Sequence, residues 1–264
     1  MLYTSEDIQL RLLSGIEIFF DDIPMYSIPL IDIINFGYTK YRQIISLLCM
    51  DDEAAKSYFK NSSKNNSTFL LISSLILSEI KSGDSEELTN SIDSIHNLLI
   101  CFLKLIFKKE VIFESSYGFI IKSDDGNKIL SVNNYNDFRN LLKTRNCIDY
   151  IEDEIENPDN EKTRKLLEKR KKLRKKLQQT KANNYDENDE QLNLADLVSI
   201  FAKAQHMPPS DVFNKYDIYQ FNDQFNRMKI FNDYNINIQA LLAGAKSEDI
   251  KLQHWLSKIH KNNN

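Results

Sequence analysis

Residues 215–259 read KYDIYQFNDQFNRMKIFNDYNINIQALLAGAKSEDIKLQHWLSKI and carry the clearest helix signals in the chain. Asp217 is a good N-cap, and Gln220, three residues later, can complete a capping box. Gly244 stands where a helix C-cap favours a left-handed residue. Between these signals the stretch predicts one long helix over residues 218–243. Apolar residues recur there at helical spacing, as on one face of a helix: Ile218, Phe221, Phe225, Met228, Phe231, Tyr234, Ile238, Leu241 and Leu242.

A second, shorter helix is expected after Gly244. Ser247 can cap it, and its apolar residues include Trp255, the only tryptophan in the sequence. The aromatic residues of both helices have two interpretations. Because large apolar side chains are usually buried, core packing of Phe225, Phe231 and Trp255 is the first expectation. The alternative is an exposed face that binds a partner peptide.

The composition favours a helical, globular protein. The 264 residues can form one large domain or two small ones, and 42% hydrophobic residues suffice for a core. Six glycines and five prolines suit helices better than an all-β fold. The formal net charge of −4 argues against a globally basic nucleic-acid binder.

The cysteines and the N-terminus predict a cytoplasmic protein. Cys49, Cys101 and Cys147 are odd in number and widely separated, which favours buried thiols in a reducing compartment. The N-terminus lacks the basic and apolar regions of a signal peptide. The most apolar run, residues 95–107, is too short for a membrane span and contains Lys104.

The fold class predicted is mainly α with a small β-hairpin, built as a helical core plus a charged helical arm. An extended segment is expected over residues 16–28, and strand and turn signals occur over 110–132. Three regions follow from the changes in composition: an N-terminal helical region with the hairpin (1–150), a charged linker with a basic helical arm (151–191), and a C-terminal helical region that packs on the N-terminal part (192–264).

The arm is strongly basic between acidic flanks. Residues 162–181 read KTRKLLEKRKKLRKKLQQTK. A solvated helix or coiled-coil arm is one interpretation, and a surface for phosphate or an acidic partner is the other. Acidic flanks and the lack of interleaved aromatic residues make nucleic acid an unlikely partner. The basic residues that would form such a surface are Lys165, Lys169, Arg170, Lys172, Arg174 and Lys176.

No catalytic motif is present in the sequence. There is no glycine-rich phosphate loop, CxxC, HExxH or GxSxG motif. The four histidines, His96, His206, His254 and His260, are isolated from one another along the chain. We therefore expect no enzyme activity, no metal and no cofactor.

Several segments resemble a known family. They are LNLADLVSIFAKA (192–204), KYDIYQFNDQFNRM (215–228), NINIQALLAGAKSEDIKLQHWLSKI (235–259) and SIPLIDIINFGYTKYRQIISLL (27–48). Together they are similar to tail assembly chaperone-like proteins from phages or prophages of low-GC Gram-positive bacteria. Positions Tyr219, Gln220, Gly244 and Trp255 match the pattern, and they can equally be determinants of the fold.

The resemblance implies a non-enzymatic role in the cytoplasm of the infected host. Such chaperones bind the tape measure protein before the tail tube polymerises, and they help to recruit tail tube subunits. A homo-oligomer is possible. Two other functions stay open: a structural tail or baseplate component of the virion, and a nucleic-acid-associated protein that uses the basic arm. The candidate partner-binding residues are Tyr219, Gln220, Phe225, Arg227 and Trp255.

Overall fold

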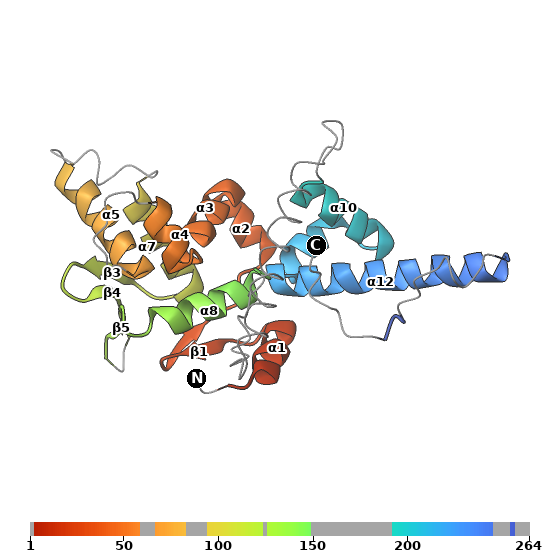
Figure 1. Ribbon diagram of the computed structural model, residues 1–264, viewed down its shortest axis with the longest axis horizontal. Helices are drawn as coiled ribbons and strands as arrows, with labels where there is room; N and C mark the ends of the chain where they lie inside the picture. Colours follow the sequence, from red (N-terminus) through yellow and green to blue (C-terminus); the bar gives the residue numbers. More distant parts are fainter. Residues whose placement is uncertain are drawn as a thin grey trace, which may run out of the picture. The chain divides into compact units, whose positions relative to one another are not determined.

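The computed structural model describes residues 3–58, 67–82, 94–123, 126–148, 192–244 and 254–256. It is mainly helical with two small antiparallel sheets, which confirms the predicted fold class (Figure 1). The basic arm lies outside the described residues. Contacts divide the chain into a first unit, Met1–Ile148 with Ser210–Phe225, and a second unit, Asp149–Pro209 with Asn226–Asn264.

The helices and strands have the following bounds. The helices are α1 (Ser5–Ser14), α2 (Leu30–Phe36), α3 (Tyr38–Leu48), α4 (Asp52–Tyr58), α5 (Thr68–Ser82), α7 (Ile95–Phe107), α8 (Tyr135–Arg145), α10 (Leu194–Ala204), α11 (Pro209–Lys215) and α12 (Ile218–Leu242). The strands are β1 (Ile18–Phe20), β2 (Ile23–Met25), β3 (Val111–Glu114), β4 (Gly118–Ile121) and β5 (Lys128–Leu130).

The segment expected to be extended, residues 16–28, folds back on itself as the hairpin β1–β2. Its two turn residues, Asp21 and Asp22, have φ values of 46° and 61°. Positive φ at both positions is what a two-residue hairpin turn of type I′ requires, and Asp tolerates it better than most residues. The Asn134 side chain also donates a hydrogen bond of 2.9 Å to Asp21 Oδ2.

The region expected to hold one hairpin forms a three-stranded sheet in the order β3-β4-β5. Two turns reverse the chain, so the strand-rich run divides into three strands. Gly118 has a φ of +102°, and a Cβ there would lie 2.5 Å from the Leu130 carbonyl oxygen. Only glycine fits this close approach of β4 and β5.

The core of the first unit is built around the apolar face of α7. Its side chains are fully buried because this face meets other elements on several sides, among them α3, α5, β2 and β3. They are Leu99, Phe102, Leu103, Ile106 and Phe107. One face of the three-stranded sheet is also buried. On its other face Ile112, Ile120 and Ile129 form a row in register, with Ile112 and Ile129 each 37% exposed.

The segment 210–225 joins the N-terminal part of the first unit through backbone and side-chain hydrogen bonds. Leu30 N–H donates to the Tyr216 carbonyl over 2.9 Å, and Pro29 and Asp217 form an isolated antiparallel bridge. Gln220 Nε2 donates to the Leu13 carbonyl over 3.0 Å. The start of α12 is therefore tied to two N-terminal elements that lie about 200 positions earlier in the chain.

Asp217 is the centre of this junction. It is 4% exposed, and its Oδ2 accepts a hydrogen bond of 2.5 Å from Ser27 Oγ. Its Oδ1 accepts from Gln220 N–H at 2.8 Å, while Gln220 Oε1 accepts from Asp217 N–H at 3.2 Å. The predicted capping box is thus confirmed. Burial lowers the pKa of the Arg145 guanidinium, and the negative charge of Asp217 opposes this effect.

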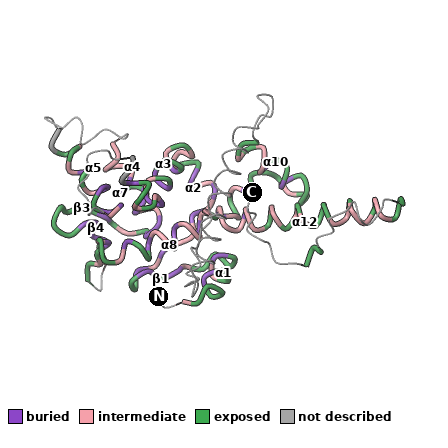
Figure 2. Tube along the Cα trace, viewed as in Figure 1, coloured by how far each residue is buried: buried purple, intermediate pink, exposed green. Residues whose placement is uncertain are grey.

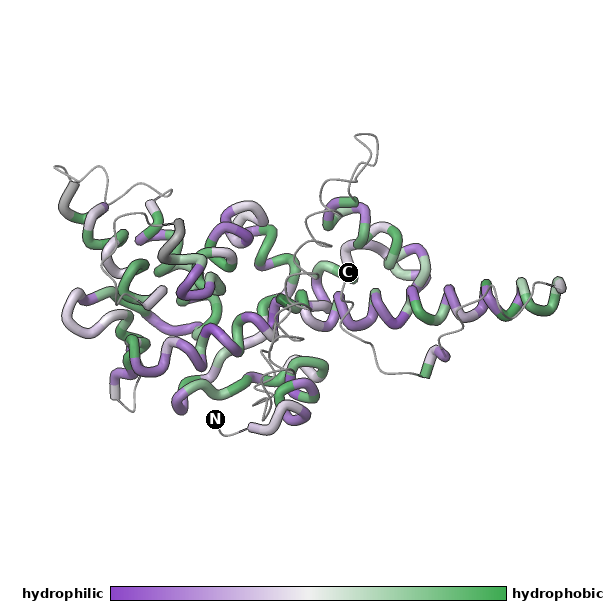
Figure 3. The backbone as a smooth tube through the Cα atoms, in the orientation of Figure 1, coloured by the Kyte–Doolittle hydropathy of each residue, from purple (hydrophilic) through white to green (hydrophobic). Residues whose placement is uncertain are grey.

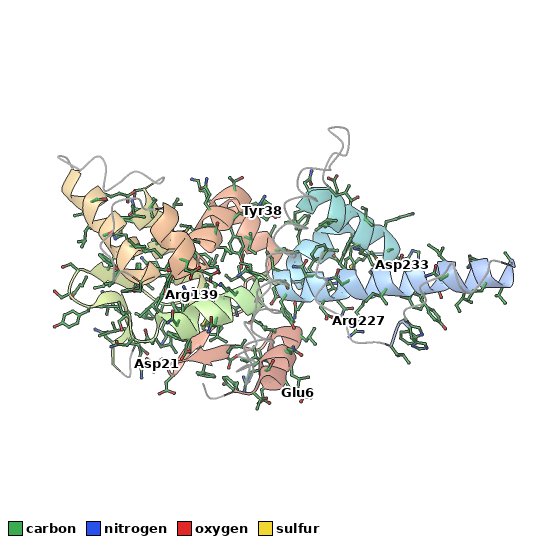
Figure 4. The ribbon with its side chains drawn as sticks, viewed as in Figure 1. Glu6, Asp21, Tyr38, Arg139, Arg227 and Asp233 are labelled. Atoms are coloured by element: carbon green, nitrogen blue, oxygen red, sulfur yellow. The ribbon has the colours of Figure 1, made fainter. Side chains whose placement is uncertain are left out.

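A second polar junction joins α4, α5 and α8. Asp52 Oδ1 accepts hydrogen bonds from Thr68 N–H (3.0 Å), Thr68 Oγ1 (2.5 Å) and Arg139 Nη1 (3.1 Å). Arg139, labelled in Figure 4, also donates to the Met50 carbonyl. Burial raises the pKa of Asp52, but the Thr68 hydrogen bonds and the Arg139 charge outweigh it, so the pKa lies below its usual value.

Replacement of Asp217 tests the junction at the start of α12. Asp217→Ala removes the N-cap, the Ser27 hydrogen bond and the charge near buried Arg145. We expect it to lower the free energy of unfolding by about 2–4 kcal/mol, measured by urea titration with far-UV circular dichroism. Asp223→Ala, on the same helix, is the control and should change it by less than about 0.5 kcal/mol. Equal effects of the two substitutions would contradict the assignment.

The Asp52 junction predicts a dependence of stability on pH. Because the folded pKa lies below the unfolded value of about 3.9, this contribution is complete above pH 4 and is lost as the pH falls through the folded pKa. We expect Asp52→Asn to be less stable than wild type at neutral pH and to lose less stability on acidification. Thr68→Val should give an intermediate slope. A slope of wild-type size in Asp52→Asn would show that this carboxylate does not carry the effect.

Candidate protein-binding face

Helix α12 has two parts with different surroundings. The predicted long helix is confirmed, with its end at Leu242, one residue before the expected end. Its first turns, up to Phe225, belong to the first unit, and the rest belongs to the second. Phe221, in the first part, is the one buried side chain of this helix. In Figure 2 the remainder of α12 is intermediate or exposed throughout.

An apolar stripe runs along the second part of α12, and we call it the outer stripe. It comprises Met228, Phe231, Tyr234, Ile238 and Leu242. At 100° per residue these positions fall within about 120° of one another around the helix. Hydrophobic and hydrophilic bands alternate along this part of the helix in Figure 3. Phe231 is 47% exposed and Leu242 is 83% exposed, so the described elements leave the stripe incompletely covered.

Two aromatic residues near the chain end contact the outer stripe. The Trp255 ring meets the Phe231 ring edge-on, with centroids 5.9 Å apart. The His254 ring lies 5.2 Å from the Tyr234 ring and stacks on Trp255 at 6.2 Å. Trp255 nevertheless remains 42% exposed.

Two expectations about this region were wrong. Phe231 and Trp255 are 47% and 42% exposed, so they are not core residues. The prediction failed because periodicity identifies an apolar face but does not show whether another element covers it. Residues 254–256 form a turn where a helix was expected. The remainder of that expected helix, residues 247–253 and 257–259, lies outside the described residues.

The candidate residues named from the sequence fall in two places. Tyr219, Gln220 and Phe225 lie in the first turns of α12. Burial raises the pKa of Tyr219 to about 12, Gln220 makes the capping box, and the half-buried Phe225 ring lies 5.7 Å from that of Phe221. These contacts give the three side chains roles in the fold.

Arg227 and Trp255 lie in the second unit. Arg227, labelled in Figure 4, is exposed and precedes Phe231 by one helical turn, so it flanks the outer stripe. Asp233, also labelled there, follows Arg227 by six positions, which at 100° per residue places it about 120° away around the helix. The six basic residues of the arm lie outside the described residues.

The two most exposed apolar residues of this helix, Ile236 and Leu242, were not among the candidate binding residues named from the sequence, although Leu242 belongs to the predicted apolar pattern. Ile236 is 62% exposed and Leu242 is 83% exposed. Ile236 lies about 140° around the helix from Phe231, outside the stripe. One signal in the sequence could have indicated this exposure. Asparagines at positions 232, 235 and 237 surround the stripe, and such polar residues are unusual in a helix that is packed on both sides.

The described part of the chain holds neither a metal-binding cluster nor a helix able to span a membrane. No group of three or more His, Cys, Asp or Glu side chains there could hold a metal ion. None of the helices in these ranges has both the length and the apolar character needed to cross a bilayer.

Comparison with known proteins links the C-terminal part of the chain to phages. Residues 183–260 match the family model described as the YomV second domain, a family associated with Bacillus phages. The matched range includes all of α12 and the residues that contact the outer stripe. No curated protein and no solved structure matches the chain. The match therefore indicates a phage-related protein and assigns no activity.

The two parts of α12 should respond differently to truncation of an aromatic residue. Phe221 is 2% exposed, so Phe221→Ala should cost about 3–5 kcal/mol of unfolding free energy. Phe231→Ala removes a half-exposed ring and should cost less than about 1 kcal/mol. Urea titration of both variants measures the difference. A loss at Phe231 as large as that at Phe221 would mean that the outer stripe is part of the core.

Proposed function

We propose that this protein is a non-enzymatic phage tail assembly chaperone that acts in the cytoplasm of the infected bacterium. Its outer stripe binds the tape measure protein, and the complex helps to recruit tail tube subunits. The observation that carries the proposal is the exposed apolar stripe on the second part of α12. The family match, which links the same residues to phages, supports it.

The residue types of the stripe suit a helical partner. Large apolar side chains at spacings of three and four can interdigitate with the apolar face of an amphipathic helix. Tyr234 adds an amphipathic ring of the kind that often contributes strongly to binding energy at protein interfaces. A tape measure protein is a long helical chain whose apolar face must be kept from aggregating before the tail tube forms.

The charges near the stripe point to apolar rather than ionic recognition. Arg227, Lys229 and Asp233 are the charged residues of the second part of α12, and opposite signs nearly balance. Binding through such a face should therefore depend only weakly on salt concentration. This expectation separates the proposal from binding of an acidic partner by the basic arm, which salt would weaken strongly.

A structural component of the virion is the second candidate, because a permanent subunit contact would also use an exposed apolar face. The two functions differ in whether the protein is present in the mature virion. A chaperone leaves before the particle is complete, so mass spectrometry of purified virions should not detect it. Its presence at a stoichiometry comparable to that of tail proteins would favour the structural role.

Co-expression with the tape measure protein of the same phage tests the proposal. The full chain should co-purify with it, and Phe231→Glu should abolish co-purification because a carboxylate would be desolvated in the apolar contact. Ile236→Glu is the matched control, since it places the same charge outside the stripe and should leave co-purification intact. Failure of the wild-type chain to associate, or equal loss in both variants, would contradict the proposed site.

A further inference from the structure

The direction of the contacts on the outer stripe shows how the chain end returns to α12. Phe231 contacts Trp255, and Tyr234, one turn further along, contacts the preceding residue, His254. The later residue on α12 thus contacts the earlier residue of the pair His254 and Trp255. The chain end therefore runs in the opposite direction to α12 at this point.

The length of the connection is compatible with this return. Gly244 has a φ of +98° and follows the end of α12, which suits a reversal of direction. Tyr234 lies ten residues before Gly244, or roughly 15 Å along the helix. The nine residues between Gly244 and His254 can span up to about 30 Å. The connection is therefore long enough to place His254 and Trp255 against the stripe of the same molecule.

His254 and Trp255 are held near the outer stripe by a short connection within the same chain. A short tether holds these residues at an effective concentration in the millimolar range, so a weak contact is enough to populate the bound state. The contact is also incomplete, because Trp255 and Phe231 are both about half exposed. A partner that covers more of the stripe can therefore displace it.

We propose that His254 and Trp255 act as an internal occupant of the outer stripe, seated where an incoming amphipathic helix binds. The occupant shields the stripe from non-specific association until the partner displaces it. The part of this inference that concerns displacement rests on the proposed function, whereas the contact within the chain does not.

Trp255 fluorescence tests the contact in the full chain without any partner. Because Trp255 is the only tryptophan, its emission reports on this site alone. Phe231→Ala should increase quenching of Trp255 by acrylamide about twofold, since the ring that covers one of its edges is gone. Ile236→Ala, a truncation on another side of the helix, should leave quenching unchanged. Unchanged quenching in Phe231→Ala, with helix content retained by circular dichroism, would overturn the inference.

Acrylamide quenching of Trp255 also tests whether a second copy of the chain is the occupant. For a contact within one chain, quenching should stay constant over a wide range of protein concentration. Quenching that decreases as the protein is concentrated would show that the chain end binds the stripe of another molecule, and the inference would fail.

Partner binding tests displacement. Trp255→Ala should weaken the occupant and lower the apparent Kd for the co-expressed tape measure protein about fivefold, because more of the chain is then free to bind. A raised Kd would make Trp255 a partner contact and would overturn the inference. If the quenching results hold but neither wild type nor Trp255→Ala binds the tape measure protein, the proposed function fails and the internal contact stands.

Discussion

The structure depends on a buried carboxylate at the start of α12. Asp217 is removed from water, so its charge needs hydrogen bonds and a nearby cation. Ser27 and the N–H of Gln220 supply the hydrogen bonds, and Arg145 supplies positive charge nearby. This requirement fixes where α12 begins on the first unit. It also explains the division of the helix, because the anchoring contacts end with Phe221 and Phe225 and the apolar residues beyond them are intermediate or exposed.

Local features of this arrangement could be predicted from the sequence, and distant ones could not. The capping box was predictable because Asp217 and Gln220 are three residues apart, and the long helix because its apolar period is regular. The hydrogen bond between Ser27 and Asp217 joins residues 190 positions apart, and no local pattern announces it. The exposure of Phe231 was mispredicted for a related reason. An apolar stripe looks the same in a sequence whether or not another element covers it.

The exposed stripe has consequences for how the molecule must behave. An incompletely covered row of large apolar side chains favours non-specific association, so it is expected at a site that binds a partner. The family match covers the anchor, the stripe and the aromatic residues that contact it, so these features lie in one phage-associated segment. An internal occupant would reconcile solubility before binding with a strong apolar contact afterwards. The isoleucine row on the three-stranded sheet is a partly exposed apolar face of the first unit, with Ile112 and Ile129 each 37% exposed and Ile120 8% exposed.

Amide hydrogen exchange on the complex with the tape measure protein tests the central claim most directly. If the outer stripe is the binding face, exchange should slow across residues 226–244 when the partner is added. Exchange near Trp255 should become faster as the chain end is displaced, and exchange in α7 should not change. Slower exchange confined to β3, β4 and β5, with α12 unaffected, would place the partner on the isoleucine row and contradict the account.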